Sequence, residues 1–474
     1  MTLRKILPGI LLLSLLLSGC GAEQKTPEPP EGVTAEENVP AAEESATPLL
    51  PVRSRTEVMS ALENAWGGDD PQTALPLTAD EGCADVMALD GDTLFVLTGR
   101  SVLVCRVGSG EAEVLTSLEV GEDWIEENGD NYWGGHEKHP AAICVLRGRL
   151  AVISDCAEYY YAVDEEGEWV FRDHSYCAVD IYDTEELENI VPMASYGQSG
   201  SFGCALVKDG NLFVATRRQL FAEDFDGNDR DDLPSLRSGE EEKKLSWDRM
   251  TLLKDGSGWY TLLSVYAPYN GVRTDSTALI GGGERMIMDA EGLSLLRGDP
   301  AEEILCSFGS ETLAWTEGEE HALGAEALTE AALRGKDWRS VAETDDGAEW
   351  SRAWDDERVL ELYRTDTGLR VVLSGGETEA VELELGYDFQ AAAEEARGIY
   401  TDAASGTLVL PAEDGWAIWK LGEDGFTYVR SLFSPDYSEN RRVFLCGGSL
   451  YAADTMRIFA LDPVTLEIQG EWVI

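Results

Sequence analysis

The feature that most constrains the fold is a short strand–turn–strand unit that recurs along the chain. Its clearest copy spans residues 205–216, where two apolar strands flank Asp209 and Gly210. Asp-Gly pairs accept the positive φ angles of a tight hairpin, and β-branched and aromatic flanks suit a pleated, half-buried surface. Further copies lie at residues 86–98, 144–153, 252–260 and 443–453. A strand pair repeated in this way predicts an all-β protein, a β-propeller.

The repeats extend over residues 80–474, which we expect to form the propeller domain. Roughly 390 residues at about 50 per blade predict seven or eight four-stranded blades. The first cluster (82–120) and the last (441–474) each show four strand signals. Contacts between these two blades therefore suffice to close the ring, and a Cys83–Cys446 disulfide is an alternative closure. An Ala- and Leu-rich stretch at 319–334 predicts one helix inserted at a blade edge.

The N-terminus has the organisation of an export signal. Arg4 and Lys5 precede an apolar run over residues 6–17, which ends in Leu17-Ser18-Gly19-Cys20. A short apolar core closed by small residues indicates a cleaved signal rather than a spanning helix. The ending resembles the lipobox of bacterial lipoproteins. That resemblance implies cleavage after residue 19, diacylglycerol on the Cys20 sulfur, and a lipid-anchored protein on the extracytoplasmic face of a bacterial cell membrane.

Residues 20–52 are acidic and rich in proline. Such a stretch buries too little apolar surface to order itself, so we expect a disordered tether. Extended, it holds the domain up to about 90 Å from the lipid. Residues 53–79 follow as a short helix and linker, because Ser54 suits an N-cap, Val58 and Leu62 have helical spacing, and Gly67-Gly68 ends the pattern.

The chain is strongly acidic, with 36 basic against 90 acidic residues and a net charge of −54. Nucleic acid is not expected as a partner, since phosphate binding needs concentrated lysine and arginine. Cationic proteins, cations and neutral ligands remain open, and so does an acidic surface that only maintains solubility.

Eight cysteines follow Cys20, and no pair has Cys-x-x-Cys spacing. Cys83, Cys144, Cys204 and Cys446 fall on expected first strands of blades, where small apolar residues suit a crowded inner ring. Buried free thiols are therefore the first expectation, and disulfides are the alternative in an exported protein.

Several stretches resemble a bacterial family of secreted or lipid-anchored proteins with a C-terminal β-propeller domain, distantly related to WD40 repeats. The residues that carry the resemblance lie at 179–183, 198–202, 209–215, 233–236, 440–444, 450–451, 458–462 and 466–467. They cover the propeller domain in order. The resemblance implies a fold and an envelope location, and it implies no reaction, substrate or catalytic residue.

Two motifs look like catalytic signatures and are not. His136-Glu137-Lys138-His139 lacks the two residues that a zinc protease has between Glu and the second His, although a metal pair of His136 and His139 on a loop stays open. Gly197-Gln198-Ser199-Gly200-Ser201 approaches the nucleophile elbow, but a strand follows where that motif needs a helix. We expect a turn there.

A cluster of oxygen ligands suggests calcium as the one candidate cofactor. Clustered carboxylate and amide oxygens suit this ion, but the register differs from an EF-hand, so a solvated acidic loop is the alternative. The candidate ligands are Asp224, Asp226, Asn228, Asp229 and Asp231.

The segment 122–140 is long for a blade connection and carries Trp124, Tyr132, Trp133, His136 and His139. Long loops with clustered aromatics suit peptide or glycan contacts, and a satellite core packed on its own blade is the alternative. Tyr159-Tyr160-Tyr161 is interpreted as strand packing.

These patterns favour a binding or scaffolding module for an envelope protein or an extracellular ligand. Loops at 121–140 and 224–247 are the expected contact regions. The alternative is a hydrolase of glycans or peptides, because propellers host both functions. Two inward carboxylates about 5–9.5 Å apart in a central channel would favour the enzyme.

Overall fold

The structure is a computed structural model. The chain divides into two units, Met1–Ala46 and Thr47–Ile474, and every described residue belongs to the second. The described residues are 49–62, 84–127, 132–163, 169–220, 233–239, 241–254, 256–282, 285–298, 300–309, 312–325, 328, 350–376, 379–389, 392, 396–435 and 440–474. The described set leaves out Cys20, Cys83 and residues 221–232, which include the five candidate calcium ligands. It includes the backbones of Tyr160 and Tyr161 but not their side chains.

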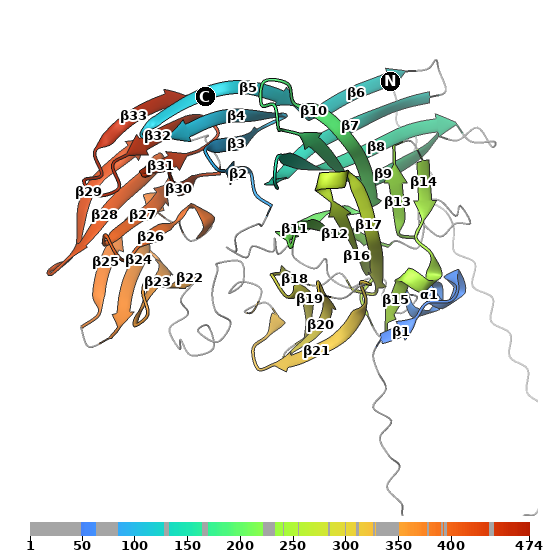
Figure 1. The fold of residues 1–474 in the computed structure, drawn as a ribbon. Helices are drawn as coiled ribbons and strands as arrows, with labels where there is room; N and C mark the ends of the chain where they lie inside the picture. The colour runs from blue at the N-terminus through green and yellow to red at the C-terminus, as the bar shows by residue number, and fades with distance from the viewer. Residues whose placement is uncertain are drawn as a thin grey trace, which may run out of the picture. The chain divides into compact units, whose positions relative to one another are not determined.

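The second unit is a β-propeller, and its described residues form seven sheets (Figure 1). Five of them have four antiparallel strands, as expected from the repeats. They are sheet 1 (β2 Met87–Asp90, β3 Thr93–Thr98, β4 Ser101–Gly108, β5 Glu111–Glu119), sheet 4 (β18 Arg285–Met288, β19 Gly292–Arg297, β20 Ala301–Ser307, β21 Trp315–His321), sheet 5 (β22 Trp350–Ala353, β23 Arg358–Thr365, β24 Gly368–Gly375, β25 Val381–Leu385), sheet 6 (β26 Tyr400–Asp402, β27 Thr407–Ala412, β28 Gly415–Gly422, β29 Gly425–Phe433) and sheet 7 (β30 Arg442–Cys446, β31 Ser449–Ala453, β32 Arg457–Leu461, β33 Ile468–Val473).

The other two sheets are larger than four strands. Sheet 2 has seven, in the spatial order β14-β13-β10-β9-β8-β7-β6, and sheet 3 has six, in the order β1-β15-β17-β16-β12-β11. Their bounds are β6 Glu122–Glu127, β7 Tyr132–Val145, β8 Arg149–Val163, β9 Trp169–Asp183, β10 Val191–Ser199, β13 Ser235–Ser238 and β14 Glu241–Lys244 for sheet 2, and β1 Leu49–Pro51, β11 Ser201–Lys208, β12 Asn211–Gln219, β15 Met250–Leu253, β16 Trp259–Ala267 and β17 Val272–Ile280 for sheet 3.

The hairpin turns form as the sequence predicts. Asp209 and Gly210 have φ angles of 51° and 84°, the left-handed values that a two-residue hairpin needs. One copy of the unit differs, because β15 and β16 do not pair with each other. β15 instead lies parallel to β17 at the outer side of sheet 3. The apolar pattern at 252–260 thus predicted both strands correctly but their pairing wrongly.

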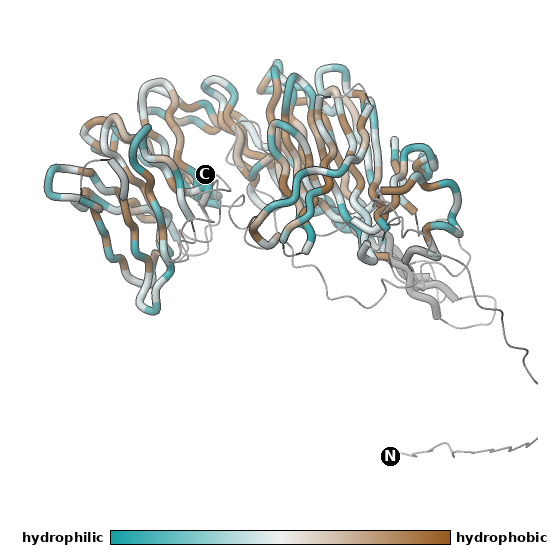
Figure 2. The backbone as a smooth tube through the Cα atoms, turned by 90° about the horizontal axis from the view of Figure 1, so that it is seen from below, coloured by the Kyte–Doolittle hydropathy of each residue, from teal (hydrophilic) through white to brown (hydrophobic). Residues whose placement is uncertain are grey.

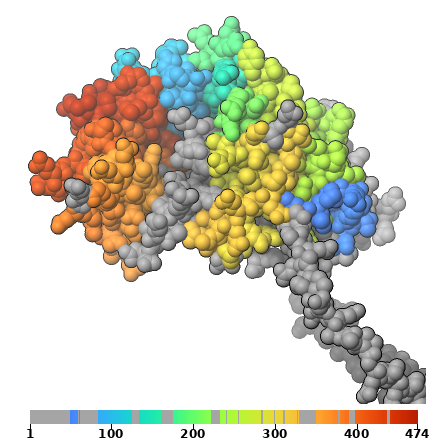
Figure 3. Space-filling view, turned by 60° about the horizontal axis from the view of Figure 1, so that its bottom comes forward, coloured from blue at the N-terminus to red at the C-terminus, as the bar shows by residue number. Residues whose placement is uncertain are grey.

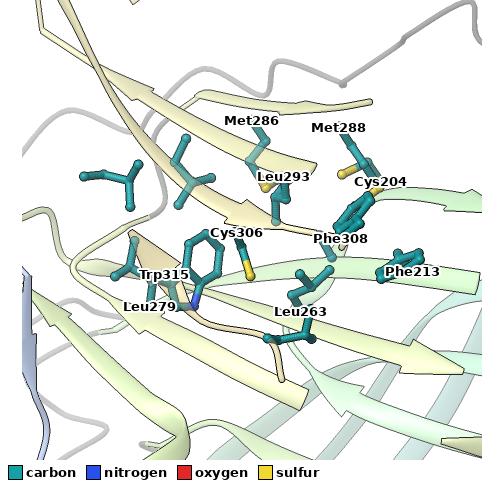
Figure 4. Packing of buried hydrophobic residues seen from close by; sticks show 14 of the residues in the cluster. Cys204, Phe213, Leu263, Leu279, Met286, Met288, Leu293, Cys306, Phe308 and Trp315 are labelled. Carbon is teal, nitrogen blue, oxygen red and sulfur yellow. The ribbon is translucent and has the colours of Figure 1, made fainter. Parts of the chain in front are cut away.

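Neighbouring sheets are held together by shared apolar cores. The middle parts of the strands are mostly apolar, and the turns between them are mostly polar (Figure 2). Figure 4 shows the core between sheets 3 and 4, where the rings of Phe213 and Phe308 stack with centroids 3.9 Å apart. Cys204 and Cys306 are buried in the same core. All seven described cysteines that follow the tether are buried free thiols, as first expected.

The first and last sheets close against each other without exchanging a strand. Their shared core includes Leu94 and Cys105 of sheet 1 and Tyr451 and Ile458 of sheet 7. Cys446 lies here as a free thiol whose Sγ donates to backbone carbonyls of sheet 1. Side-chain contacts therefore link the two ends, as expected, and Cys446 does so without a disulfide.

Ion pairs reinforce this closure. Asp85, just before β2, accepts hydrogen bonds from Arg442 at 2.6 and 2.7 Å and pairs with Arg397 at 2.9 Å. The Tyr451 hydroxyl accepts from a backbone N–H of sheet 1 at 2.7 Å and donates to a carbonyl there at 2.8 Å. We call Asp85, Arg397, Arg442 and Tyr451 the closure cluster.

The segment before the propeller packs on sheet 3. β1 pairs with β15, and the helix α1 (Arg55–Leu62) begins after Ser54, whose Oγ accepts from the Glu57 N–H at 3.3 Å. Val58 is fully buried against the sheet, and Figure 3 shows this segment in blue beside the yellow-green residues. The predicted cap is confirmed, while residues 49–51, expected in the tether, form a strand.

The helix expected at 319–334 begins later than predicted: Ala325 and Leu328 are helical, and the Leu328 N–H donates to the Gly324 carbonyl at 3.1 Å. Residues 329–334 lie outside the described residues. β21 continues to His321, which lies opposite Ala301 of β20, so cross-strand pairing overrides the helical propensity of its first residues. Within the described residues, no helix is long and apolar enough to cross a membrane.

Candidate functional site

Sheet 2 differs from the regular sheets by three added strands and by the length of β7, β8 and β9, which have 14 or 15 residues. Its near half, around Ile143, Val152 and Val179, packs in the cores shared with sheets 1 and 3. The remainder of the long strands, residues 132–140, 154–163 and 169–176, we call the distal half of sheet 2. Figure 1 shows these long strands with β6 beside them.

Both predicted contact regions join this one sheet, although as strands rather than loops. Residues 122–127 and 132–145 form the hairpin β6–β7, and residues 235–238 and 241–244 form β13–β14. β7 contains Gly134, Gly135 and Pro140, although glycine and proline are unusual inside strands. Gly135 is required for packing, since a Cβ there would lie 2.6 Å from the Tyr159 ring. β8 contains Tyr159, which agrees with the expected strand packing.

The cross-strand register gathers a row of side chains on one face of the distal half. Trp124 lies opposite His136, with ring centroids 6.0 Å apart. His136 stacks near Tyr176 at 6.4 Å, and its Nε2 lies 3.1 Å from the Tyr176 hydroxyl. The Arg237 guanidinium lies 4.1 Å from the centroid of the Tyr176 ring. We call Trp124, His136, Tyr176 and Arg237 the aromatic row.

One end of the row is firmly fixed. Arg237 donates two hydrogen bonds to Glu158, at 2.8 and 2.9 Å, and lies 3.4 Å from Glu242. Burial opposes the charge of Arg237, but the bonds with Glu158 outweigh it and raise the pKa of the guanidinium. Gly197 makes room for this stack, since a Cβ there would lie 3.1 Å from Arg237 and 3.2 Å from Tyr176.

The other end of the row faces solvent. Trp124 is 43% exposed. Between the two ends, burial raises the pKa of Tyr176 far above its ordinary value, so its hydroxyl stays protonated as a hydrogen-bond donor. Burial likewise raises the pKa of the neighbouring Cys156 thiol to about 11, which makes that thiol unreactive at neutral pH.

The two predicted histidines do not act together. His136 belongs to the aromatic row, whereas His139 lies on the opposite face, 3.3 Å from Glu137. A single ion cannot be held by both, because the sheet separates them. Within the described residues, no cluster of three or more potential metal ligands occurs. Side chains of Tyr132 and Trp133 are outside the described set, and so are the five candidate calcium ligands, for which calcium binding stays a prediction.

The Gly197–Ser201 motif has no catalytic geometry. It runs from β10 through Gly200, at φ +94°, into β11, as the sequence predicted. Ser199 Oγ accepts hydrogen bonds from the Tyr260 hydroxyl at 2.7 Å and from the Ser235 N–H at 2.9 Å. It is buried and serves as an acceptor within the sheet.

Sequence reasoning missed Tyr176, Glu158 and Arg237. They come from three different strands, β8, β9 and β13, and only the strand register brings them together. The one usable signal was the position of Arg237, which lies within the predicted contact region 224–247.

No protein-family model matches the chain, and no curated protein matches it either. Among solved structures, apo AztD from Citrobacter koseri is 10% identical, with 83% of this chain and 94% of that chain covered and a TM-score of 0.28. A second structure of Citrobacter koseri AztD is 11% identical over 82% and 93%, at 0.28. A chain of the mitotic checkpoint complex is 12% identical over 91% and 96%, at 0.30. These similarities are too low to carry an argument about function.

Proposed function

We propose that this protein is a lipid-anchored, extracytoplasmic β-propeller that binds an envelope protein or an extracellular ligand. The propeller fold is compatible with a binding module. The lipobox at Leu17–Cys20 supports the anchor and the location.

The observation that carries the proposal is the aromatic row. It is built on strands that a four-stranded blade does not need, namely β6, β13 and the distal parts of β7, β8 and β9. Trp, Tyr and Arg, the residues that make up most of this row, are enriched at the centres of binding surfaces. A sheet enlarged at one place, with a Trp left 43% exposed, is better explained by recognition than by stability.

In-cell photo-crosslinking tests the proposal. A photoreactive phenylalanine analogue replaces Trp124 in the lipidated chain, and adducts are identified by mass spectrometry. The matched control places the same analogue at Val464, which is 74% exposed in the turn between β32 and β33. We expect one envelope component to be recovered from position 124 and not from 464, and to be lost when Cys20→Ala removes the lipid. Equal recovery from both positions would contradict the proposed binding surface.

A further inference from the structure

We infer that the partner presents an extended segment bearing lysine or arginine, which adds as a strand to β6 and places a cation on Trp124. This inference rests on the proposed function, because it describes how the aromatic row binds. Three independent features of β6 support it: its position in the sheet, its charge, and its similarity to the Arg237 end of the row.

β6 is the last strand of sheet 2. It pairs with β7 along Glu122–Glu127, and within the described residues no strand pairs with its other side. The backbone N–H and C=O groups on that side are therefore available to an incoming strand. Proteins often bind extended peptides in this way, with main-chain hydrogen bonds for affinity and alternate side chains for specificity.

The sequence of β6 selects the charge of the incoming strand. Four of its six residues are Glu or Asp. Asp123 is paired with Arg100, but Glu122 is exposed, and its cross-strand neighbour Lys138 is engaged with Asp180 at 2.6 Å. A second copy of the same strand would place like charges opposite each other, which is unfavourable, whereas a basic strand would be attracted.

The Arg237 end of the aromatic row shows the chemistry that this surface favours. There a guanidinium lies on the Tyr176 ring and is bound by Glu158. Trp124 offers the same combination, an aromatic ring with Glu122 two residues away on the same face of the strand. A strand added beside β6 places its side chain about 5 Å from Trp124, within range of a cation–π contact.

The test uses a fluorescent ten-residue peptide of alternating Lys and Thr, measured by anisotropy against the full-length lipidated chain in detergent. The chain carries a net charge of −54, so charge alone attracts any basic peptide. Two further peptides, N-methylated at every second residue in opposite registers, therefore decide the mode. We expect one register to lose binding at least tenfold and the other to retain it.

Matched variants locate the site. Trp124→Ala and Glu122→Gln should each weaken binding at least tenfold, whereas Tyr428→Ala, which removes an aromatic that is 57% exposed on the edge strand β29, should leave it unchanged. Equal effects of Trp124→Ala and Tyr428→Ala, or of both methylated registers, would overturn the inference. So would a self-association of the chain that Trp124→Ala abolishes. If position 124 still crosslinks one partner that has no basic extended segment, the proposed function stands and this inference fails.

Discussion

The closure cluster and the aromatic row are made of the same kinds of side chain and serve different ends. In the closure cluster, Asp85 receives Arg442 from sheet 7 and Arg397 from the short turn before sheet 6, and Tyr451 bonds backbone groups across the joint. In the row, Arg237 is fixed by Glu158 over Tyr176, while Trp124 at the far end stays exposed. The charged groups of the closure cluster are paired across the joint between sheets, whereas the aromatic row is anchored by ion pairs at its Arg237 end and exposed at Trp124.

The largest expected effect is on the closure side. Asp85→Asn leaves Arg397 and Arg442 buried without their shared carboxylate, and removal of one member of a buried ion pair typically destabilises a protein by about 3–5 kcal/mol. Chemical denaturation measures the loss. The control is Asp355→Asn, a surface carboxylate paired with Arg358, which should change the midpoint little. Equal effects of the two substitutions would show that the closure cluster contributes nothing special.

The ionisation of Asp85 also predicts that the protein loses stability at acidic pH. Burial opposes ionisation of Asp85, but the hydrogen bond and charge of Arg442 and the charge of Arg397 outweigh it, so its pKa lies below the usual value. A lowered folded-state pKa adds stability above the unfolded-state pKa of about 4, and this stability is lost as pH falls through the folded value. The difference in stability between wild type and Asp85→Asn should therefore shrink progressively as the pH of the denaturation experiment falls from about 4 through the lower folded-state pKa of Asp85.

A smaller effect is expected at the fixed end of the row. Arg237→Lys keeps the charge but removes the paired donors that bind Glu158, and we expect a loss of about 1–2 kcal/mol. The proper comparison is Arg457→Lys on sheet 7, whose arginine pairs with the more exposed Glu471. That variant should lose less. A larger loss from Arg457→Lys would mean that Arg237 is not the anchor of the row.

The contrast between these regions also marks what the sequence could reveal. Hairpin turns such as Asp209-Gly210 are local, so the repeat predicted the propeller and the four strands of its first and last sheets. Trp124 and His136 were found as an aromatic cluster in one segment. Tyr176, Glu158 and Arg237 could not be found, because their contacts depend on the register of long strands, which no local pattern determines.

A second buried carboxylate sharpens the comparison, because its pKa shifts in the opposite direction. Asp155, on β8, has a raised pKa: burial dominates over the hydrogen bond from the Phe202 N–H and the charge of His139. A raised folded-state pKa means that stability falls as pH rises from the unfolded-state value to the folded one. Asp155→Asn keeps an acceptor for Phe202, so it should stabilise the protein at pH 7.

The pH dependence checks this reasoning. Thermal unfolding of wild type and Asp155→Asn should give a difference that is largest at neutral pH and disappears below the unfolded-state pKa of about 4. A destabilised Asp155→Asn variant at pH 7 would show that the charge of Asp155 is favourable, and that Asp155 behaves like Asp85 despite having no arginine among the groups that shift its pKa.

The smallest effect on stability, and the one that decides the comparison, is expected at the open end of the row. Trp124 is 43% exposed and lies beside His136 at the sheet edge, so Trp124→Ala should change the free energy of unfolding by no more than about 0.5 kcal/mol. The same substitution should abolish partner capture. If Trp124→Ala instead destabilises the protein as much as Arg237→Lys, the row is a satellite core packed on its own sheet. If Trp124→Ala leaves the free energy of unfolding unchanged and abolishes partner capture, the ring of Trp124 serves binding rather than stability.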